Sequence, residues 1–437
     1  MSTQRKVVHL ESLITHWQIA VKQYSDACNA MVLLNGQSLR SHRTRLMASV
    51  LLACFDSFIG DHKQAIVQIQ AGLGLIEQIQ TMYPKHQNPR PEGFIEEDLL
   101  IIFTRLAIQA KSYDMAFHFP QPYVIRLAAQ HSTLTGPSTS FLDAGSSGGR
   151  SDVSIPSRFT SLVDARVASD KLNEKLLRFI EHLQIAKNDK SNVLPASWKH
   201  YGMDLKGQLD AWGAAFEHIF KSRTGPQISS VEQAAISALK MFHINTNVLF
   251  MMMFCDTESH FDGFLPQFKA IVNLGWEVIC AERRRVSTDD VGSDKCSPRQ
   301  HVGATGTLSQ IKPSFSADLG IVPPLFVVAT KCREPRLRRQ AIRLLRSSAR
   351  REGMWDSELA ANIGHWIMTV EEGGDAAQPH QHNSEPMPTE PIPEERRVMV
   401  KSVDFDLRDR FADLRVGTRA VHEGQTDSRV RVTRLTW

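Results

Sequence analysis

The chain has 437 residues, of which 42% are hydrophobic and 22% are charged, and its formal net charge is +4 at neutral pH. This hydrophobic content supports a packed core and excludes a chain that is disordered throughout. The small net charge excludes a polycationic protein of the histone kind but allows a local basic patch. No apolar run approaches the ~18 residues that a membrane-spanning helix needs, and the N-terminus lacks the apolar core of a signal peptide.

The cysteines are spaced too widely for a zinc knuckle or a redox pair. Most of them fall in apolar helical stretches, where cysteine acts as a small hydrophobic residue. We therefore expect no metal site and a reducing intracellular compartment. The six residues are Cys28, Cys54, Cys255, Cys280, Cys296 and Cys332.

Helical periodicity runs through an N-terminal part, residues 1–131. A first helix is predicted over 5–34, and Asn35-Gly36 supplies its stop. Its apolar residues at helical spacing are Val7, Leu10, Ile14, Trp17, Val21, Tyr24, Cys28 and Met31. Further helices are predicted over 45–59, 63–80 and 94–111, and the first two of these form an antiparallel hairpin. Gly72 and Gly74 inside the hairpin indicate close helix packing.

Two segments of low apolar content interrupt the helical pattern. Residues 132–158, rich in Ser, Gly and Pro, predict a flexible loop, and residues 373–395 predict a disordered Pro-rich linker. Between them lies a second helical part, 159–372, with a polar loop at 287–315. Its predicted helices are 159–188, 196–222, 229–255, 261–286, 317–332, 335–350 and 356–372.

The C-terminal tail, residues 396–437, differs from the rest of the chain. Apolar and polar residues alternate over 398–403 and 430–435, which is typical of short strands. The expected fold class is therefore all-α, a multi-helical domain of antiparallel helical hairpins with a short mixed or β C-terminal tail.

No motif points to catalysis. The stretch 145–149 has the letters of a nucleophile elbow, but it lies inside the Ser/Gly/Pro loop, without the required strand and helix. His422-Glu423 opens like a zinc-binding helix motif, yet Thr426 stands where the second histidine must be. No phosphate-binding glycine loop is present. We expect no catalytic residue, no cofactor and no bound metal, and predict that the protein is not an enzyme.

The most distinctive local signal is basic. Residues 331–351 hold nine Lys or Arg and one Glu, which leaves 42 basic and 46 acidic residues elsewhere. From Pro335 onward five arginines recur in steps of three and four, on one face of an amphipathic helix. This face is a candidate contact for nucleic acid or an acidic partner, and the alternative is an ordinary solvated face. The five residues are Arg336, Arg339, Arg343, Arg346 and Arg350.

Two stretches resemble the regulatory region of fungal binuclear zinc cluster transcription factors. Residues 51–61 (LLACFDSFIGD), followed by Ala71-Gly72-Leu73, are similar to its early part, and residues 323–357 (PPLFVVATKCREP through RREGMWDS) are similar to its late part. The resemblance covers about residues 15–375, with a loose middle. It implies an all-helical region that regulates transcription, often of metabolic or secondary-metabolite genes.

The DNA-binding module of that family holds two zinc ions on six closely spaced cysteines. Residues 1–40 contain one cysteine, Cys28, so the zinc ligands of the family transfer to no residue of this sequence. We expect either a regulator without its own DNA-binding module or a gene model that has lost its first exon.

The sequence therefore predicts a nuclear transcription regulator that acts through protein partners, such as a DNA-bound transcription factor. Nucleic-acid binding is expected to be weak and non-specific at most, without membrane association, and a homodimer or heterodimer is compatible with this role. The alternative is a cytosolic helical scaffold or small-molecule sensor with no direct role in transcription.

Overall fold

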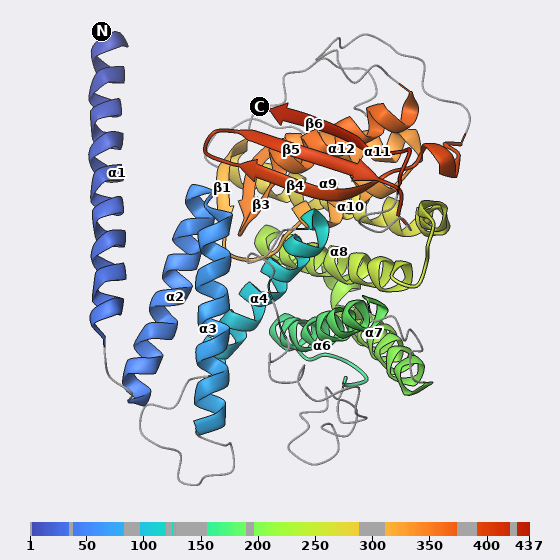
Figure 1. Ribbon diagram of the computed structural model, residues 1–437, viewed down its shortest axis with the longest axis horizontal. Coiled ribbons are helices and arrows are strands. Elements are labelled where there is room, and N and C mark those ends of the chain that lie inside the picture. Colours follow the sequence, from blue (N-terminus) through green and yellow to red (C-terminus); the bar gives the residue numbers. More distant parts are fainter. Residues whose placement is uncertain are drawn as a thin grey trace.

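The computed structural model describes residues 2–34, 38–82, 97–118, 125, 127, 155–188, 196–287, 311–373, 391–419 and 426–437. Helices dominate this part of the chain (Figure 1). The N-terminal helices are α1 (Ser2–Leu33), α2 (Leu39–Ile59), α3 (His62–Met82) and α4 (Glu97–Phe117). The body contains α6 (Leu162–Asn188), α7 (Ala196–Ser222), α8 (Ser230–Met252), the 3-10 helix η2 (Glu258–Phe264), α9 (Leu265–Ser287), α10 (Val322–Lys331), α11 (Pro335–Arg346) and α12 (Ser357–Glu372).

Helices α2 and α3 form the predicted hairpin, and local chemistry fixes its turn. Gly60 adopts a left-handed conformation (φ +90°) at the end of α2, where glycine carries no Cβ penalty. The Asp61 carboxylate then accepts a hydrogen bond of 3.1 Å from the backbone N–H of Gln64 in the first turn of α3. Farther along α3, a Cβ on Gly72 would lie 2.1 Å from the Phe103 ring of α4. This contact confirms the close packing predicted at Gly72. The same prediction is wrong at Gly74, where a Cβ would meet nothing within 4 Å.

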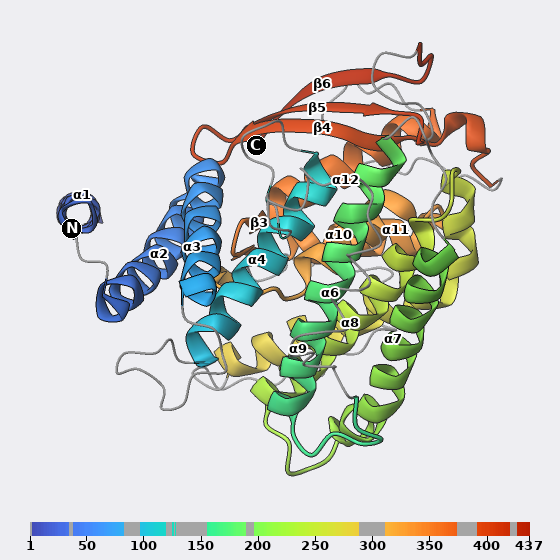
Figure 2. The ribbon, with the colours of Figure 1, turned by 60° about the horizontal axis from the view of Figure 1, so that its bottom comes forward.

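A C-terminal sheet lies across one face of the helical body (Figure 2). Its strands are β4 (Met399–Asp406), β5 (Phe411–Gly417) and β6 (Arg431–Thr436), paired antiparallel in the order β4-β5-β6. The predicted strands 398–403 and 430–435 correspond to β4 and β6, whereas β5 is not among the predicted strands. Side chains on one face of β4 and β5 are buried against the helices, whereas β6 is mostly exposed.

An aromatic cluster shows how deeply the sheet is joined to the helices. Its rings come from α4, α10, the short strand β3 (Trp355–Asp356) and β4, with centroids 4.6 to 5.9 Å apart. Such ring pairs add about 0.5–1.5 kcal/mol each beyond their buried area. The C-terminal strands are therefore part of the main core. The cluster comprises Tyr113, Phe117, Phe326, Trp355 and Phe405.

A second small sheet was not predicted. Strand β1 (Ile311–Ser316) pairs in parallel with β2 (Ser348–Glu352), which pairs antiparallel with β3. Gly353, at φ +56°, makes the turn between β2 and β3. The predicted polar loop over 287–315 is thus wrong at its end, and the predicted helix 335–350 ends at Arg346. Strands this short carry little periodicity, and their pairing depends on residues far away in the chain.

The fold class predicted from the sequence, an all-α multi-helical domain with a short β tail, is confirmed. The predicted linker 373–395 needs correction at its end, because Ile392 is 5% exposed and residues 394–396 form a 3-10 helix. The buried side chain of Ile392 fixes this end of the segment to the folded part of the chain. The low overall apolar content of the segment did not indicate this contact. Residues 132–154 and 374–390 lie outside the described part of the chain. Among the described helices, none is long and apolar enough to cross a membrane.

Two of the buried histidines pack against aromatic rings in the core. His62, in the first turn of α3, stacks on Phe405 with ring centroids 4.0 Å apart, and His243 on α8 lies against Trp212 at 4.6 Å. Burial lowers the pKa of His62 to about 4 and the pKa of His243 to about 3. The folded protein therefore holds both rings neutral, whereas the unfolded chain takes up protons near pH 6.5. Their contribution to stability is present above pH ~6.5 and is lost as the pH falls toward the folded pKa values.

We predict that His62→Phe reduces the acid sensitivity of the fold. Phenylalanine keeps the stacking on Phe405 and removes the titration. Between pH 6 and pH 4.5 the free energy of unfolding should fall by about 1.4 kcal/mol less per pH unit than in the parent protein. Urea unfolding at a series of pH values measures this slope. The control His200→Phe changes an exposed ring and should keep the parent slope, and an identical slope for both variants would contradict the assignment.

Candidate functional site

Helix α11 carries the basic segment, and its ends are fixed by local interactions. The Glu334 carboxylate accepts a hydrogen bond of 2.6 Å from the backbone N–H of Leu337, and Pro335 occupies the first turn. At the other end, the Ser347 hydroxyl donates to the carbonyl of Leu344. The amphipathic helix is thus present, although its buried face includes one charged residue, Arg338. The buried residues of α11 are Arg338, Ala341, Ile342, Leu344 and Leu345.

Three of the five predicted arginines form an exposed ridge on α11. Arg336, Arg343 and Arg346 are exposed, and we call them the outer ridge. Arg346 also donates a hydrogen bond of 3.2 Å to the side chain of Asn362. Arg339 is half-buried, since its guanidinium donates to the Glu372 carboxylate at 3.0 Å. The outer ridge is therefore smaller than the sequence predicted.

Arg350 does not belong to this face, and its prediction is wrong. The helix ends at Arg346, and Arg350 lies in β2 with 9% of its surface exposed. Its guanidinium pairs with the carboxylates of Glu282 and Glu352, and its backbone N–H donates to the hydroxyl of Ser357 at 3.1 Å. Arg350 continues the helical spacing of the arginines in the sequence, but the pairing of β2 with β1 and β3 places it in a strand.

Two other arginines of the segment are buried, and the spacing of the arginines alone does not distinguish them from the exposed ones. Arg338 is fully buried, donating to the Glu371 carboxylate at 2.7 Å and to the Ala329 carbonyl at 2.9 Å. Arg333 donates to the other oxygen of Glu371 at 2.6 Å. A signal was available for Arg338, because it precedes Ala341, Ile342 and Leu345 by three, four and seven residues, which is the spacing of the apolar face.

A second buried carboxylate, Glu258, gathers three cations. It is 0% exposed and accepts hydrogen bonds from Lys331 at 3.0 Å, Arg333 at 3.1 Å and Arg419 at 2.9 Å. Burial acts to raise the pKa of Glu258, but the three cations outweigh it and lower the pKa to about 2. The pKa of Glu371 is also lowered, because Arg338 and Arg333 outweigh its burial. Both carboxylates therefore stay ionised at neutral pH.

These groups form one buried charge cluster that joins segments far apart in the sequence. Glu258 begins η2, Glu371 lies in the last turn of α12, and Arg419 follows strand β5. The Glu371 carboxylate also accepts a hydrogen bond of 2.9 Å from the backbone N–H of Val398, just before β4. The cluster thus ties the C-terminal sheet to the helices. We refer below to Glu258, Lys331, Arg333, Arg338, Glu371 and Arg419 as the charge cluster.

The segment that enters the sheet is also held by contacts to η2. Arg397 makes a two-pronged ion pair with Asp262, at 2.9 and 2.7 Å. The carboxylate of Glu394 accepts hydrogen bonds from the backbone N–H groups of Glu258 and Ser259, at 3.2 and 2.7 Å. A hollow of about 320 Å³ lies here, with a largely apolar lining that includes Phe261, Phe268, Pro335 and Ile392.

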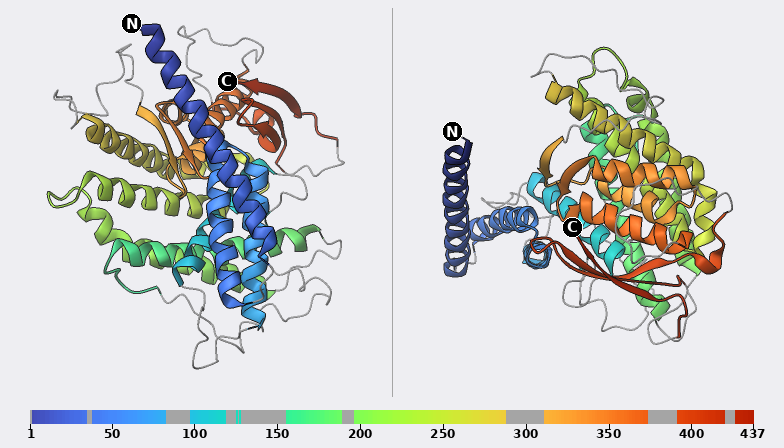
Figure 3. Two further views of the ribbon diagram at one scale, coloured as in Figure 1. Left: turned by 90° about the vertical axis from the view of Figure 1, so that its left-hand side faces the viewer. Right: turned by 90° about the horizontal axis from the view of Figure 1, so that it is seen from above.

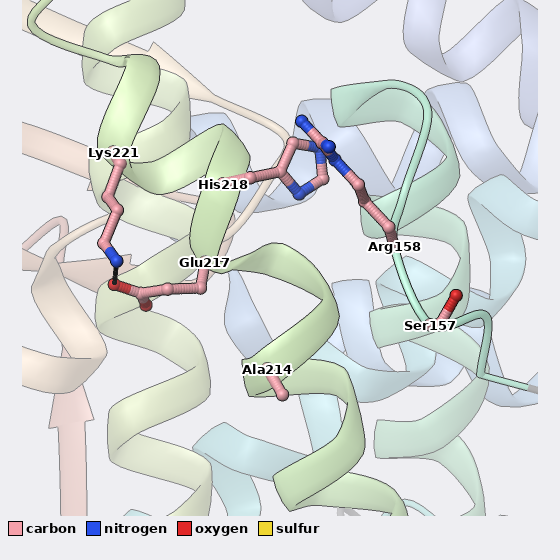
Figure 4. A pocket seen from close by; sticks show the side chains of 6 residues that line it. All are labelled: Ser157, Arg158, Ala214, Glu217, His218 and Lys221. Atoms are coloured by element: carbon pink, nitrogen blue, oxygen red, sulfur yellow. Dashed lines mark ion pairs between the residues drawn. The ribbon is translucent and has the colours of Figure 1, made fainter.

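Another hollow, of about 300 Å³, opens between the segment before α6 and helix α7 (Figure 4). It is lined by Ser157, Arg158, Ala214, Glu217, His218 and Lys221. Glu217 pairs with Lys221 at 3.7 Å, one turn along α7, and the His218 ring bonds the carbonyl of Ala215 at 3.1 Å. This arrangement is typical of a solvated helix surface. It offers no nucleophile held by a base, so it suggests no reaction.

The described residues hold no group of three His, Cys, Asp or Glu side chains placed to bind a metal ion. Cys280 is disulfide-bonded, which contradicts the expectation that the cysteines are reduced. Cys296 lies outside the described residues. The remaining cysteines carry free thiols: Cys28, Cys54, Cys255 and Cys332.

A known protein is similar to part of this chain. Over 71 residues, which are 16% of the chain, it is 41% identical to the aspercryptin biosynthesis cluster-specific transcription regulator of Emericella nidulans. The matched segment spans 12% of that relative's own length. No protein-family model matches the chain, and no solved structure matches it. The comparisons thus establish a local similarity to a fungal transcription regulator.

We predict that replacing a buried arginine of α11 changes stability far more than replacing an exposed one. Arg338→Met leaves Glu371 with less compensation in a buried site and should destabilise the fold by about 3–5 kcal/mol. Arg336→Met alters only the exposed outer ridge and should change stability by less than about 0.5 kcal/mol. Urea unfolding followed by circular dichroism measures both. Equal effects of the two substitutions would mean that the buried ion pair is not structurally important.

Proposed function

We propose that this chain is the regulatory region of a transcription regulator related to fungal zinc cluster factors, and that it controls secondary-metabolite genes. The observation that carries the proposal is the 41% identity over 71 residues to a cluster-specific transcription regulator. The resemblance of residues 51–61 and 323–357 to the regulatory region of zinc cluster factors also supports it. On this proposal the protein is not an enzyme and works in the nucleus.

Residues 323–357, the second of these two stretches, have a structural role that is consistent with a regulatory scaffold. The stretch around Arg333 and Arg338 builds the charge cluster, and Asp356 caps α12 by accepting from the backbone N–H groups of Glu358 and Leu359, at 3.0 and 2.9 Å. The motif residues are thus used to assemble the fold around α10 to α12. Partner contacts are left to side chains on its surface.

We assign partner binding to the outer ridge on α11. Arg336, Arg343 and Arg346 place three positive charges on one exposed helix face. An acidic surface of a DNA-bound regulator is complementary to this face, and such complementarity favours fast and selective association. The ridge also attracts nucleic-acid phosphates, but that attraction is salt-sensitive and carries no base code. On this proposal the chain reaches its target genes through a protein partner.

A second candidate function rests on the hollow beside η2. Its apolar lining and volume of about 320 Å³ suit a small apolar molecule, as a cytosolic sensor or scaffold would require. The charged groups at its rim, Arg333 and Arg397, are already paired with carboxylates. Glu334, which also lines the hollow, accepts a hydrogen bond from the backbone N–H of Leu337. These charged groups are thus already engaged within the chain, and we rank this function second.

The proposal is tested by tethering the chain to a reporter gene through an unrelated DNA-binding domain in yeast. Recruitment of the transcription machinery, or its exclusion, should change reporter output several-fold relative to the DNA-binding domain alone. Reversing the outer ridge with Arg336→Glu, Arg343→Glu and Arg346→Glu should return the output to baseline, because the partner contact is lost.

A matched control separates the ridge from general charge effects. Lys171→Glu, Lys199→Glu and Lys269→Glu reverse three exposed charges elsewhere on the helices, and this variant should keep the parent output. A reporter that stays unchanged, although the fusion is expressed and nuclear, would contradict the role in transcription. Equal loss in both triple variants would contradict the assignment of the outer ridge.

A further inference from the structure

The outermost strand of the C-terminal sheet has one edge that no described strand covers. β6 pairs with β5 on one side, and none of the other strands in the described ranges pairs with it on the other. The sheet lies on the outside of the helical body (Figure 2 and the right view of Figure 3). An edge of this kind presents backbone N–H and C=O groups to which another strand can add. β6 has no proline and keeps a regular register with β5, so it lacks two devices that commonly prevent strand addition.

The hydrogen-bond pattern of the ladder identifies the residues whose backbone groups face outward. In an antiparallel ladder, directly opposed residues alternate between bonded and non-bonded pairs. The backbone N–H of Trp437 donates to the carbonyl of Arg410 at 3.2 Å, so the preceding residue of β6, Thr436, belongs to a non-bonded pair. The same alternation puts Arg434 and Val432 in non-bonded pairs with β5. Each of these three residues therefore directs one N–H and one C=O toward the open edge.

Side chains on both faces of the sheet hold β6 in place within the single chain. Leu435 and Trp437 are half-buried and pack against the hydrophobic core. On the outer face the Arg434 guanidinium donates to both carboxylate oxygens of Asp413, at 2.6 and 2.5 Å, and lies 4.8 Å from the ring centroid of Phe411. A strand that is already ordered loses little conformational entropy when another strand adds to it.

The charge along this edge favours an acidic strand as the occupant. Arg431 and Arg434 are exposed, and residues 428–437 contain no Asp or Glu. Arg415 on the neighbouring strand β5 is exposed as well. Asp413 pairs with Arg434, so an excess of positive charge remains beside the edge. Opposite charges on adjacent strands stabilise their pairing.

A second copy of β6 is less suited to this edge than an acidic strand. It would bring two further arginines and no Asp or Glu of its own. Antiparallel pairing of two copies about the middle of 431–437 places Arg434 of one copy opposite Arg434 of the other. Like charges at directly opposed positions destabilise such a pair. The arginines therefore act against self-pairing and select an occupant of opposite charge.

We propose that β6 binds an extended acidic segment of a partner protein, which adds to the sheet as an antiparallel strand. Backbone hydrogen bonds to Val432, Arg434 and Thr436 supply affinity, and the side chains supply selectivity. The partner places acidic residues opposite Arg431 and Arg434 and an apolar residue opposite Val432, which is 69% exposed. This edge is a different surface from the outer ridge on α11, and the inference does not depend on the proposed role in transcription.

Fluorescence anisotropy with a labelled peptide tests this proposal on the full chain. The probe is a peptide of three Thr-Val-Glu repeats. In one antiparallel register its three-residue period places glutamate opposite both Arg431 and Arg434 and valine opposite Val432. This peptide should bind the parent protein. A peptide of three Thr-Val-Lys repeats reverses the charge and should bind about tenfold more weakly or less.

Two variants separate backbone pairing from charge. Val432→Pro removes one outward N–H but leaves the charge and the ladder bonds to β5 in place, and proline is tolerated at such edge positions. Arg431→Glu with Arg434→Glu keeps the backbone and reverses the charge. Each variant should weaken binding of the Thr-Val-Glu peptide by about tenfold. The control Lys171→Glu with Lys199→Glu reverses two exposed charges elsewhere and should keep the parent affinity.

An N-methylated form of the peptide tests the backbone contacts on the unaltered protein. Methylation of the glutamate backbone nitrogens keeps the charge and removes donors, so binding should again fall about tenfold. Circular dichroism confirms that each variant is folded. The proposal is overturned if the parent protein does not bind the Thr-Val-Glu peptide, or if the N-methylated or lysine peptide binds equally well. It is also overturned if light scattering shows a dimer of about twice 49.1 kDa that Val432→Pro makes monomeric, because the edge then belongs to a second copy.

Discussion

The ion pairs of Arg333 and Arg338 with Glu371 lie where the last three helices meet the C-terminal sheet, and the arrangement of these elements depends on them. A buried charge is costly unless its partner is present, so the elements that supply these groups must assemble together. Glu258 adds the same requirement for Lys331 and Arg419, which are separated from it by 73 and 161 residues in the chain. The cluster thus makes η2, α10 to α12 and the C-terminal sheet one interdependent unit.

The same constraint divides the arginines of one basic segment into a buried set and an exposed set. Arg333, Arg338 and Arg350 lie inside the protein, each facing carboxylates from distant elements. Arg336 and Arg343 lie outside, where they change the surface potential without affecting the core. A count of nine basic residues therefore overstates the charge that this segment places on the surface. The surface signal is a ridge of three arginines on a rigid helix, and rigidity reduces the entropy lost when a partner orders them.

Long periodic elements could be predicted from the sequence, and elements fixed by distant contacts could not. The α2–α3 hairpin follows from its apolar rhythm and from the stop at Gly60. The strand β2 replaced a predicted helix because its pairing partners are residues 311–316 and 355–356. The ridge was found by helical spacing, but the separation of Arg338 from Arg339 required its apolar neighbours to be weighed as well. Ile392 was missed because one buried side chain does not alter the composition of a polar segment.

Hydrogen–deuterium exchange of the Glu371→Gln variant tests the central claim most directly. This substitution keeps the shape of the side chain and removes the charge that Arg333 and Arg338 face. If the cluster holds the sheet to the helices, amides of 398–417 should exchange at least tenfold faster than in the parent protein. The α2–α3 hairpin, which does not contribute to the cluster, should keep its protection. Unchanged exchange over 398–417, or an equal increase in the hairpin, would contradict this account.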